Sequence, residues 1–105
     1  MFVFEIFTAK LDKMAETRKH LTTDFYELQK KKPELLEKLK NYTVYQQMIG
    51  PYGKFYMVWE AESFEDYQTI MSNMIGDEDM RKYLGGWSGL LVDGLMSIEL
   101  LNKIT

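Results

Sequence analysis

The chain has 105 residues and a formal net charge of −3, and 46% of its residues are hydrophobic while 28% are charged. This length and balance predict one globular domain that spans residues 1–105. The acidic net charge argues against nucleic acid as a partner. The chain contains no cysteine, which excludes disulfides, cysteine-based zinc sites and thiol catalysis.

Neither a targeting signal nor a membrane span is evident. Residues 1–7 are apolar except for Glu5, but they lack the basic start and the small-residue cleavage site of a signal peptide. No apolar run approaches the roughly 20 residues that a membrane-spanning helix needs. We therefore expect a cytoplasmic protein without a membrane partner.

The first half of the chain predicts a strand, a long helix and a short helix. Residues 2–9 are rich in β-branched and aromatic residues, which is typical of a strand. The long helix is predicted from an N-cap at Asp12 to residues 30–32, because Pro33 disfavours helical geometry just before it. Its apolar residues fall on one helical face: Met14, Leu21, Phe25 and Leu28. Pro33 then begins a short helix over residues 33–40.

The second half predicts a hairpin, further helices and a last strand. Strands over residues 42–49 and 54–61 flank the turn signal Gly-Pro-Tyr-Gly at residues 50–53. Ser63 is a good N-cap for the next helix, which should end at Gly76-Asp77. The apolar face of that helix comprises Phe64, Tyr67, Ile70, Met71, Met74 and Ile75. Residues 78–84 predict another helical segment, ended by two glycines, and residues 95–104 predict the final strand.

This order of strand, helix, strand, strand, helix, strand predicts an α+β ferredoxin-like βαββαβ fold. Its four-stranded antiparallel sheet should have helices on one face and the first strand between the third and the last. The two faces of the sheet differ in polarity. The set predicted to lie under the helices is apolar: Phe2, Phe4, Ile6, Phe55, Met57, Trp59, Met96, Ile98 and Leu100.

The opposite set is mixed in polarity: Val3, Glu5, Phe7, Tyr56, Val58, Glu60, Ser97, Glu99 and Leu101. A half-solvated sheet face normally alternates more cleanly, and this one carries many large apolar groups. We therefore expect the chain to be its own partner, as a homodimer that covers this face. The alternative is a monomer whose mixed face is covered by a loop or remains exposed to water.

The order of elements and the stretch Val-Trp-Glu-Ala-Glu-Ser-Phe at residues 58–64 resemble the dimeric α+β barrel superfamily. An acidic-hydrophobic segment at residues 77–84, followed by Leu-Leu-Val at 90–92, is similar to NIPSNAP-like domains, with antibiotic-biosynthesis-monooxygenase domains as near relatives. The resemblance implies two sheets paired face to face around a barrel-like space between protomers.

Three acids on the mixed face are the first site candidates. Glu5, Glu60 and Glu99 should point the same way from neighbouring strands, and clustered carboxylates raise the pKa of at least one of them. Glu5 or Glu99 could then act as a general base. The alternatives are a site for a hard cation, ion pairs with Lys or Arg across the dimer, or a place at the wet rim.

Polar groups beside these acids could contact a ligand. Tyr45, Gln47 and Tyr56, together with Glu60, are the predicted ligand-binding residues, although a buried tyrosine more often serves packing. The one histidine, His20, is expected to be solvated on the long helix and outside the barrel space. The segment Gly-Gly-Trp-Ser-Gly at residues 85–89 is interpreted as a helix stop with Trp87 docked on the core or a partner, and a lid is a further hypothesis.

No metal or cofactor is predicted. A metal pair would need a second histidine. Haem-degrading relatives in this superfamily use a histidine in the second helical region, an asparagine on the first strand and a tryptophan near the third. Trp59 matches the tryptophan, but neither the asparagine nor the histidine is present.

The predicted function is the binding of a small, mostly apolar molecule between the paired sheets of a homodimer. One alternative is a cofactor-free monooxygenase- or isomerase-like enzyme in which a barrel carboxylate acts as general base. Another is a purely structural or interaction domain. The sequence contains no nucleophile–base pair and no cofactor motif, which favours the binding role.

Overall fold

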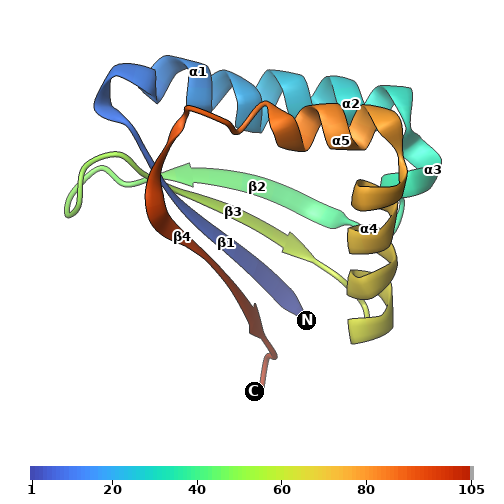
Figure 1. The fold of residues 1–105 in the computed structure, drawn as a ribbon. Coiled ribbons are helices and arrows are strands. Elements are labelled where there is room, and N and C mark those ends of the chain that lie inside the picture. Colours follow the sequence, from blue (N-terminus) through green and yellow to red (C-terminus); the bar gives the residue numbers. More distant parts are fainter. Residues whose placement is uncertain (105) are drawn as a thin grey trace.

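The computed structural model describes residues 1–104 and has the predicted α+β architecture, with helices packed on one face of a single sheet (Figure 1). The four strands are antiparallel and lie in the order β2-β3-β1-β4, so the first strand lies between the third and the last as predicted. In chain order the elements are β1 (Phe2–Ala9), η1 (Leu11–Lys13), α1 (Met14–Lys19), η2 (His20–Asp24), α2 (Phe25–Lys31), α3 (Pro33–Leu36), β2 (Lys40–Gln46), β3 (Lys54–Glu60), α4 (Phe64–Gly76), α5 (Glu78–Gly85) and β4 (Leu91–Leu101).

The predicted long helix is not uniform. It begins with the 3-10 turn η1, which contains Asp12, and no side chain caps that turn or α1. The segment η2 is a π-helical turn between α1 and α2. A π-turn changes which backbone carbonyls find partners inside the helix and is often found at functional sites. Leu21, Phe25 and Leu28 of the predicted stripe are buried.

The β2–β3 hairpin has the predicted turn, although β2 ends at Gln46 and not at residue 49. Gly50 and Gly53 have positive φ of 113° and 86°, a region that side-chain-bearing residues disfavour. A Cβ at Gly53 would lie 2.9 Å from the carbonyl oxygen of Ala9. The backbone of the turn therefore lies tightly against the end of β1.

Side-chain caps fix the two helices after β3. The Oγ of Ser63 accepts a hydrogen bond from the backbone N–H of Asp66 at 3.1 Å, which confirms the predicted N-cap of α4. Asp77 caps α5 in the same way, since its Oδ2 accepts from the N–H groups of Asp79 and Met80. Ile70 of α4 is buried, while Phe64 and Ile75, at the ends of the predicted apolar face, are exposed.

The register of β1 places its side chains on the opposite faces from those predicted. Val3, Glu5 and Phe7 lie opposite Trp59, Met57 and Phe55 of β3, all of which are on the helix-covered face. Phe2, Phe4 and Ile6 consequently lie on the open face. A one-residue change in the assignment of a strand moves every side chain to the other face, which is what happened to this prediction.

Both alternating sets of β1 side chains contain large apolar residues. The sequence prediction therefore placed the set without an acid on the helix-covered face. A hydrogen bond from Trp59 to Glu5 stabilises the buried carboxyl group and makes the other arrangement possible.

The core lies between the helices and the central strands β1 and β3. The edge strand β4 is less covered. Met96, Ile98 and Leu100 share the helix-side face in the register, yet they are 53%, 42% and 37% exposed. Within residues 1–104, no helix is both long and apolar enough to cross a bilayer.

Candidate functional site

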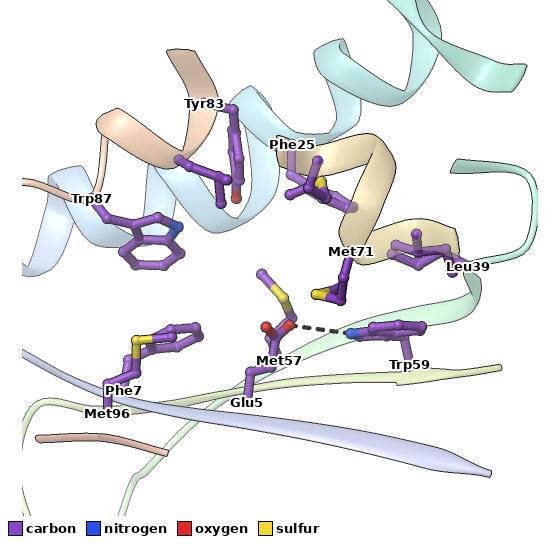
Figure 2. Close-up of a pocket in the computed structure, with 13 residues that line it drawn as sticks. Glu5, Phe7, Phe25, Leu39, Met57, Trp59, Met71, Tyr83, Trp87 and Met96 are labelled. Carbon is purple, nitrogen blue, oxygen red and sulfur yellow. Dashed lines mark hydrogen bonds between the residues drawn. The ribbon is translucent and has the colours of Figure 1, made fainter. Parts of the chain in front are cut away.

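A cavity of about 80 Å³ lies between the sheet and the helices (Figure 2). Strands β1, β3 and β4 contribute its floor, and α2, α4 and α5 contribute its roof. The lining residues are Glu5, Phe7, Phe25, Leu39, Met57, Trp59, Ile70, Met71, Met74, Tyr83, Leu84, Trp87 and Met96. Glu5 is the one acidic group in this otherwise mostly apolar lining.

Glu5 projects from β1 into the cavity, as Figure 2 shows. Its Oε2 accepts a hydrogen bond from the indole Nε1 of Trp59 at 3.1 Å. Burial raises the pKa of the Glu5 carboxyl, and the hydrogen bond from Trp59 offsets only part of this increase. Part of the residue remains accessible to water. The site therefore holds a carboxyl group that can exchange a proton closer to neutral pH than an ordinary glutamate can.

Four methionines line the same cavity as this carboxyl group: Met57, Met71, Met74 and Met96. Methionine side chains are unbranched and polarizable, so they adapt to ligands of different shape. From the sequence, Met71 and Met74 were placed only on the apolar face of a helix. In the structure they fill the core and also line the cavity.

Two tyrosines, the partly buried Tyr42 and the buried Tyr83, fix the helical roof through the π-turn η2. The hydroxyl of Tyr42 donates to the backbone oxygen of Leu21 at 2.6 Å, and that of Tyr83 donates to the oxygen of His20 at 3.1 Å. Burial raises the pKa of both tyrosine hydroxyls strongly, so both remain protonated donors. Their function is to satisfy backbone oxygens of η2, which excludes them as acids for chemistry in the cavity.

His20 is buried, which contradicts the expectation that it is solvated. It is 6% exposed, its ring stacks on Tyr83 at 4.1 Å between centroids, and it meets Trp87 nearly at right angles at 4.7 Å. Its Nδ1 is 3.4 Å from Oδ2 of Asp24, while its buried Nε2 has no hydrogen-bond partner among the described residues. Burial lowers the pKa of His20, although Asp24 opposes this change.

The outer side of His20 borders an open groove of about 370 Å³ between η2, α2 and α5. Tyr83 lines this groove and also the cavity, while Trp87 lines the cavity alone. The aromatic pair of Tyr83 and Trp87 thus lies between His20 and the Glu5 cavity. No group of three or more potential metal-ligating residues occurs in the part of the chain that the structure describes.

The predicted cluster of three acids does not form. Glu60 lies opposite Phe2 and Glu99 lies opposite Phe4, so both are on the open face, whereas Glu5 is on the helix-covered face. Strands β3 and β4 flank β1, which separates Glu60 and Glu99 by roughly 10 Å. Placing Glu5 with them was wrong, while the catalytic role predicted for Glu5 or Glu99 stays a prediction.

The predicted ligand-binding residues are partly brought together. Tyr45 lies opposite Tyr56 on the open face, and the Tyr56 hydroxyl donates to Oε1 of Gln47 at 2.9 Å. Glu60 is at the other end of β3, where its carboxylate accepts from the side-chain amide of Asn41. None of these residues lines the Glu5 cavity.

Sequence reasoning missed the groups that surround the cavity. Trp59 was placed in the apolar set under the helices and matched to a tryptophan of haem-degrading relatives, but its hydrogen bond to Glu5 was not expected. His20 is distant in sequence from Tyr83 and Trp87 and meets them only after η2 and α5 pack together. The one available signal was the Gly-Gly-Trp segment, since two glycines permit close approach of a neighbouring side chain.

Comparisons with known proteins identify the fold. The sequence matches no protein-family model and no curated protein. Among solved structures, a NIPSNAP family protein of unknown function from Agrobacterium tumefaciens aligns with a TM-score of 0.75 at 17% identity. The alignment covers 95% of this chain and 84% of the chain of that protein. A NIPSNAP-like domain protein from Burkholderia xenovorans aligns with a TM-score of 0.72 at 20% identity, covering 99% and 86%.

A proposed antibiotic biosynthesis monooxygenase from Deinococcus radiodurans is also similar, with a TM-score of 0.66 at 11% identity and coverage of 99% and 94%. These identities are low, so the likeness concerns the fold. The strand order and these similarities together identify the chain's fold as ferredoxin-like, a fold that it shares with solved NIPSNAP family proteins and antibiotic biosynthesis monooxygenase-like proteins.

Proposed function

We propose that the protein binds a small, mostly apolar molecule in the cavity between its sheet and its helices, with Glu5 as the polar anchor. The observation that carries this proposal is a carboxyl group inside a methionine-rich cavity with Trp59 as its one hydrogen-bond partner among the described residues. Binding pockets for small molecules typically combine an apolar lining with a few such polar groups. The proposed ligand site therefore lies inside one protomer, whereas the sequence predicted a site in the space between two sheets.

The anchor gives the ligand a defined chemistry. One Glu5 oxygen accepts from Trp59, so the other oxygen is available to a hydroxyl or N–H group of the ligand. The surrounding methionines and aromatic rings contact the apolar remainder. A compound with one hydrogen-bond donor on an apolar body fits this arrangement.

A pair of isosteric probes tests the anchor. Phenol and toluene are similar in size, but only phenol can donate a hydrogen bond. We expect Glu5→Leu to lower the ratio of phenol affinity to toluene affinity about tenfold, the effect of losing one hydrogen bond to a carboxyl group. Titrations followed by NMR measure both affinities, and Glu99→Gln, on the open face, is the matched control.

Phenol and toluene differ in hydration, but this difference cancels when their affinity ratio is compared between the wild-type protein and the variant. An unchanged ratio in Glu5→Leu, or the absence of binding of both probes to the wild-type protein at millimolar concentration, would refute the proposed function. A fall of the same size in Glu99→Gln would point to the open face as the site.

A second candidate function rests on the same carboxyl group. Its raised pKa and its partly dry surroundings suit proton abstraction from a bound ligand, as in a cofactor-free isomerase or monooxygenase. Glu5→Gln keeps the shape and a hydrogen-bonding group but removes the base. Any turnover found by substrate screening should therefore be lost in Glu5→Gln while phenol binding persists.

We also propose that the protein is a homodimer whose protomers meet through their open sheet faces. The register places Phe2, Phe4 and Ile6 on that face beside Val58 and Leu101. The face is therefore more apolar than the sequence alone predicted, and a second copy would remove this surface from water. Each protomer would keep its own Glu5 cavity on the other side of its sheet.

A further inference from the structure

The cavity is too small for an ordinary ligand, which indicates that one of its walls must move. Its volume is about 80 Å³, whereas pockets that hold drug-sized molecules measure roughly 300–1,000 Å³. Most lining residues belong to the sheet or to helices that pack against it. Trp87 is an exception, because it lies between the end of α5 and the start of β4.

Side-chain contacts hold Trp87 in place more than its backbone does. Its indole stacks on Phe7 at 4.5 Å and meets the His20 ring at 4.7 Å. The backbone hydrogen bonds of residues 86–88 reach only residues up to four positions earlier in the chain. Gly85 and Gly89 have open space where a Cβ would lie, and Gly89 has a φ of 80° that favours glycine. The backbone at Gly85 and at Gly89 is therefore loosely packed.

Gly86 differs from these glycines because it contacts His20 directly. A Cβ at Gly86 would lie 2.4 Å from Cε1 and 3.0 Å from Nδ1 of the His20 ring. The absence of a side chain at this position lets the segment lie against the imidazole. The same ring also supports Trp87, so His20 holds the segment at two points, through Gly86 and through the indole.

We propose that Trp87 is the gate of the Glu5 cavity and that His20 is the positioning residue that holds the gate closed. The inference rests on the proposed binding function and specifies how a ligand larger than the closed cavity enters. Movement of residues 85–89 removes the indole from Phe7 and enlarges the cavity on the side of Met96. It also uncovers the Nε2 of His20, which is buried without a partner in the closed form.

The gate responds to pH because the closed form holds His20 away from water. The charged groups around its ring are Lys19 at the end of α1, Asp24 of η2, Glu27 and Lys31 on α2, and Asp79 and Lys82 on α5, and the Tyr83 ring is stacked on one face. These are three acids and three lysines, so their charges balance and burial decides the protonation state. Burial disfavours the imidazolium form, which means that protonation favours the open form, where water reaches the ring.

Two glycine variants test the gate with a built-in control. Gly86→Ala places a methyl group against His20, whereas Gly85→Ala places one in open space. For the fluorescence measurements each is made in a Trp59→Phe background, so that Trp87 is the sole tryptophan, whereas ligand affinity is measured with Trp59 present, because Trp59 holds Glu5. We expect acrylamide to quench Trp87 fluorescence at least about threefold faster in Gly86→Ala, and at an unchanged rate in Gly85→Ala. The apparent affinity for 1-naphthol should rise about tenfold in Gly86→Ala only, because closure no longer competes with the ligand.

Variants of His20 keep the test decisive if Gly86→Ala does not fold. In the same background, His20→Ala should give fast quenching at every pH, and His20→Phe should give slow quenching at every pH because its ring restores the packing. The protein with His20 intact should change from slow to fast quenching as the pH falls from 7.5 through the lowered pKa of His20. A Trp87→Phe variant, in which Trp59 alone reports, should show no such change.

Equal quenching in Gly86→Ala and Gly85→Ala, or in His20→Ala and the protein with His20 intact at pH 7.5, would overturn the gate. That result is distinct from failure of the binding function, which is read from the phenol-to-toluene ratio of Glu5→Leu. A pH response that persists in His20→Phe would assign the titration to another group and remove His20 from the mechanism.

Discussion

At the scale of single residues, Glu5 and His20 are two titratable groups that burial affects in opposite directions. Burial raises the pKa of the acid and lowers that of the base, so both favour the neutral form. The main partner that opposes the shift is Trp59 for Glu5 and Asp24 for His20. The protein thus holds two titratable groups whose charged forms burial disfavours, on either side of the Tyr83 and Trp87 rings.

The raised pKa of Glu5 predicts a stability that depends on pH in a defined direction. The folded protein retains the Glu5 proton at pH values where the unfolded chain has lost it, so folding becomes less favourable as the pH rises from 4.5 through the folded pKa. Glu5→Gln cannot ionise. It should therefore be more stable than the wild-type protein at pH 7.5 by about 1 kcal/mol, the lower end of the cost of an imperfectly paired buried polar group.

Urea unfolding at pH 4.5 and 7.5 measures this difference, which should shrink at the lower pH. Glu99→Gln is the control, because Glu99 lies on the exposed side of β4. A gain in stability of equal size at both pH values would show that ionisation of Glu5 is not its cause.

At the scale of elements, the π-turn η2 determines where the roof of the cavity lies. It interrupts a helix that the sequence pattern predicted as continuous, and it presents the backbone oxygens of His20 and Leu21 to tyrosines from α5 and β2. These two hydrogen bonds connect three elements that are far apart in the sequence. The aromatic cluster at the gate depends on that connection.

Removing either tyrosine hydroxyl should therefore destabilise the fold. We expect Tyr42→Phe and Tyr83→Phe each to lower the free energy of unfolding by about 1–2 kcal/mol, because a buried carbonyl oxygen loses its donor while the ring packing is kept. Denaturant titration provides the measurement. Tyr52→Phe, at an exposed position of the hairpin turn, should change the free energy by less than about 0.5 kcal/mol. Equal effects at all three positions would contradict the role assigned to η2.

At the scale of the whole molecule, one sheet separates two surfaces with different proposed uses. The helix-covered face holds the Glu5 cavity, while the open face offers apolar side chains to a second copy. Because the two lie on opposite sides, ligand binding and dimerisation should be separable by mutation.

A charge at the centre of the open face tests this separation. Phe4 lies between Val58 and Glu99, so Phe4→Glu would place two acids side by side. Light scattering should give twice the chain mass of 12.5 kDa for the wild-type protein and the single mass for Phe4→Glu. Ala15→Glu, at an exposed position of α1, should leave the dimer intact. A wild-type mass of one chain at micromolar concentration would refute the proposed dimer, and loss of phenol binding in Phe4→Glu would show that the two surfaces are coupled.

Periodicity and capping determined the order of elements, because these signals are local. Ser63 as an N-cap, the break at Gly76-Asp77 and the glycine-rich hairpin turn each follow from the preferences of a few adjacent residues. The order of elements in turn predicted the ferredoxin-like topology, including the central position of β1. An open sheet face with large apolar residues was also visible, although the sequence assigned the wrong β1 residues to it.

Tertiary structure alone decided which face of β1 meets the helices. Both alternating sets of that strand are largely apolar, so the outcome depended on Trp59, 54 residues away in the chain, which donates to Glu5. The burial of His20 had the same origin, since its ring is enclosed by Tyr83, Trp87 and Gly86 from distant segments. A side chain's own sequence neighbours fix its local geometry, but its burial and its pKa depend on groups that only folding brings to it.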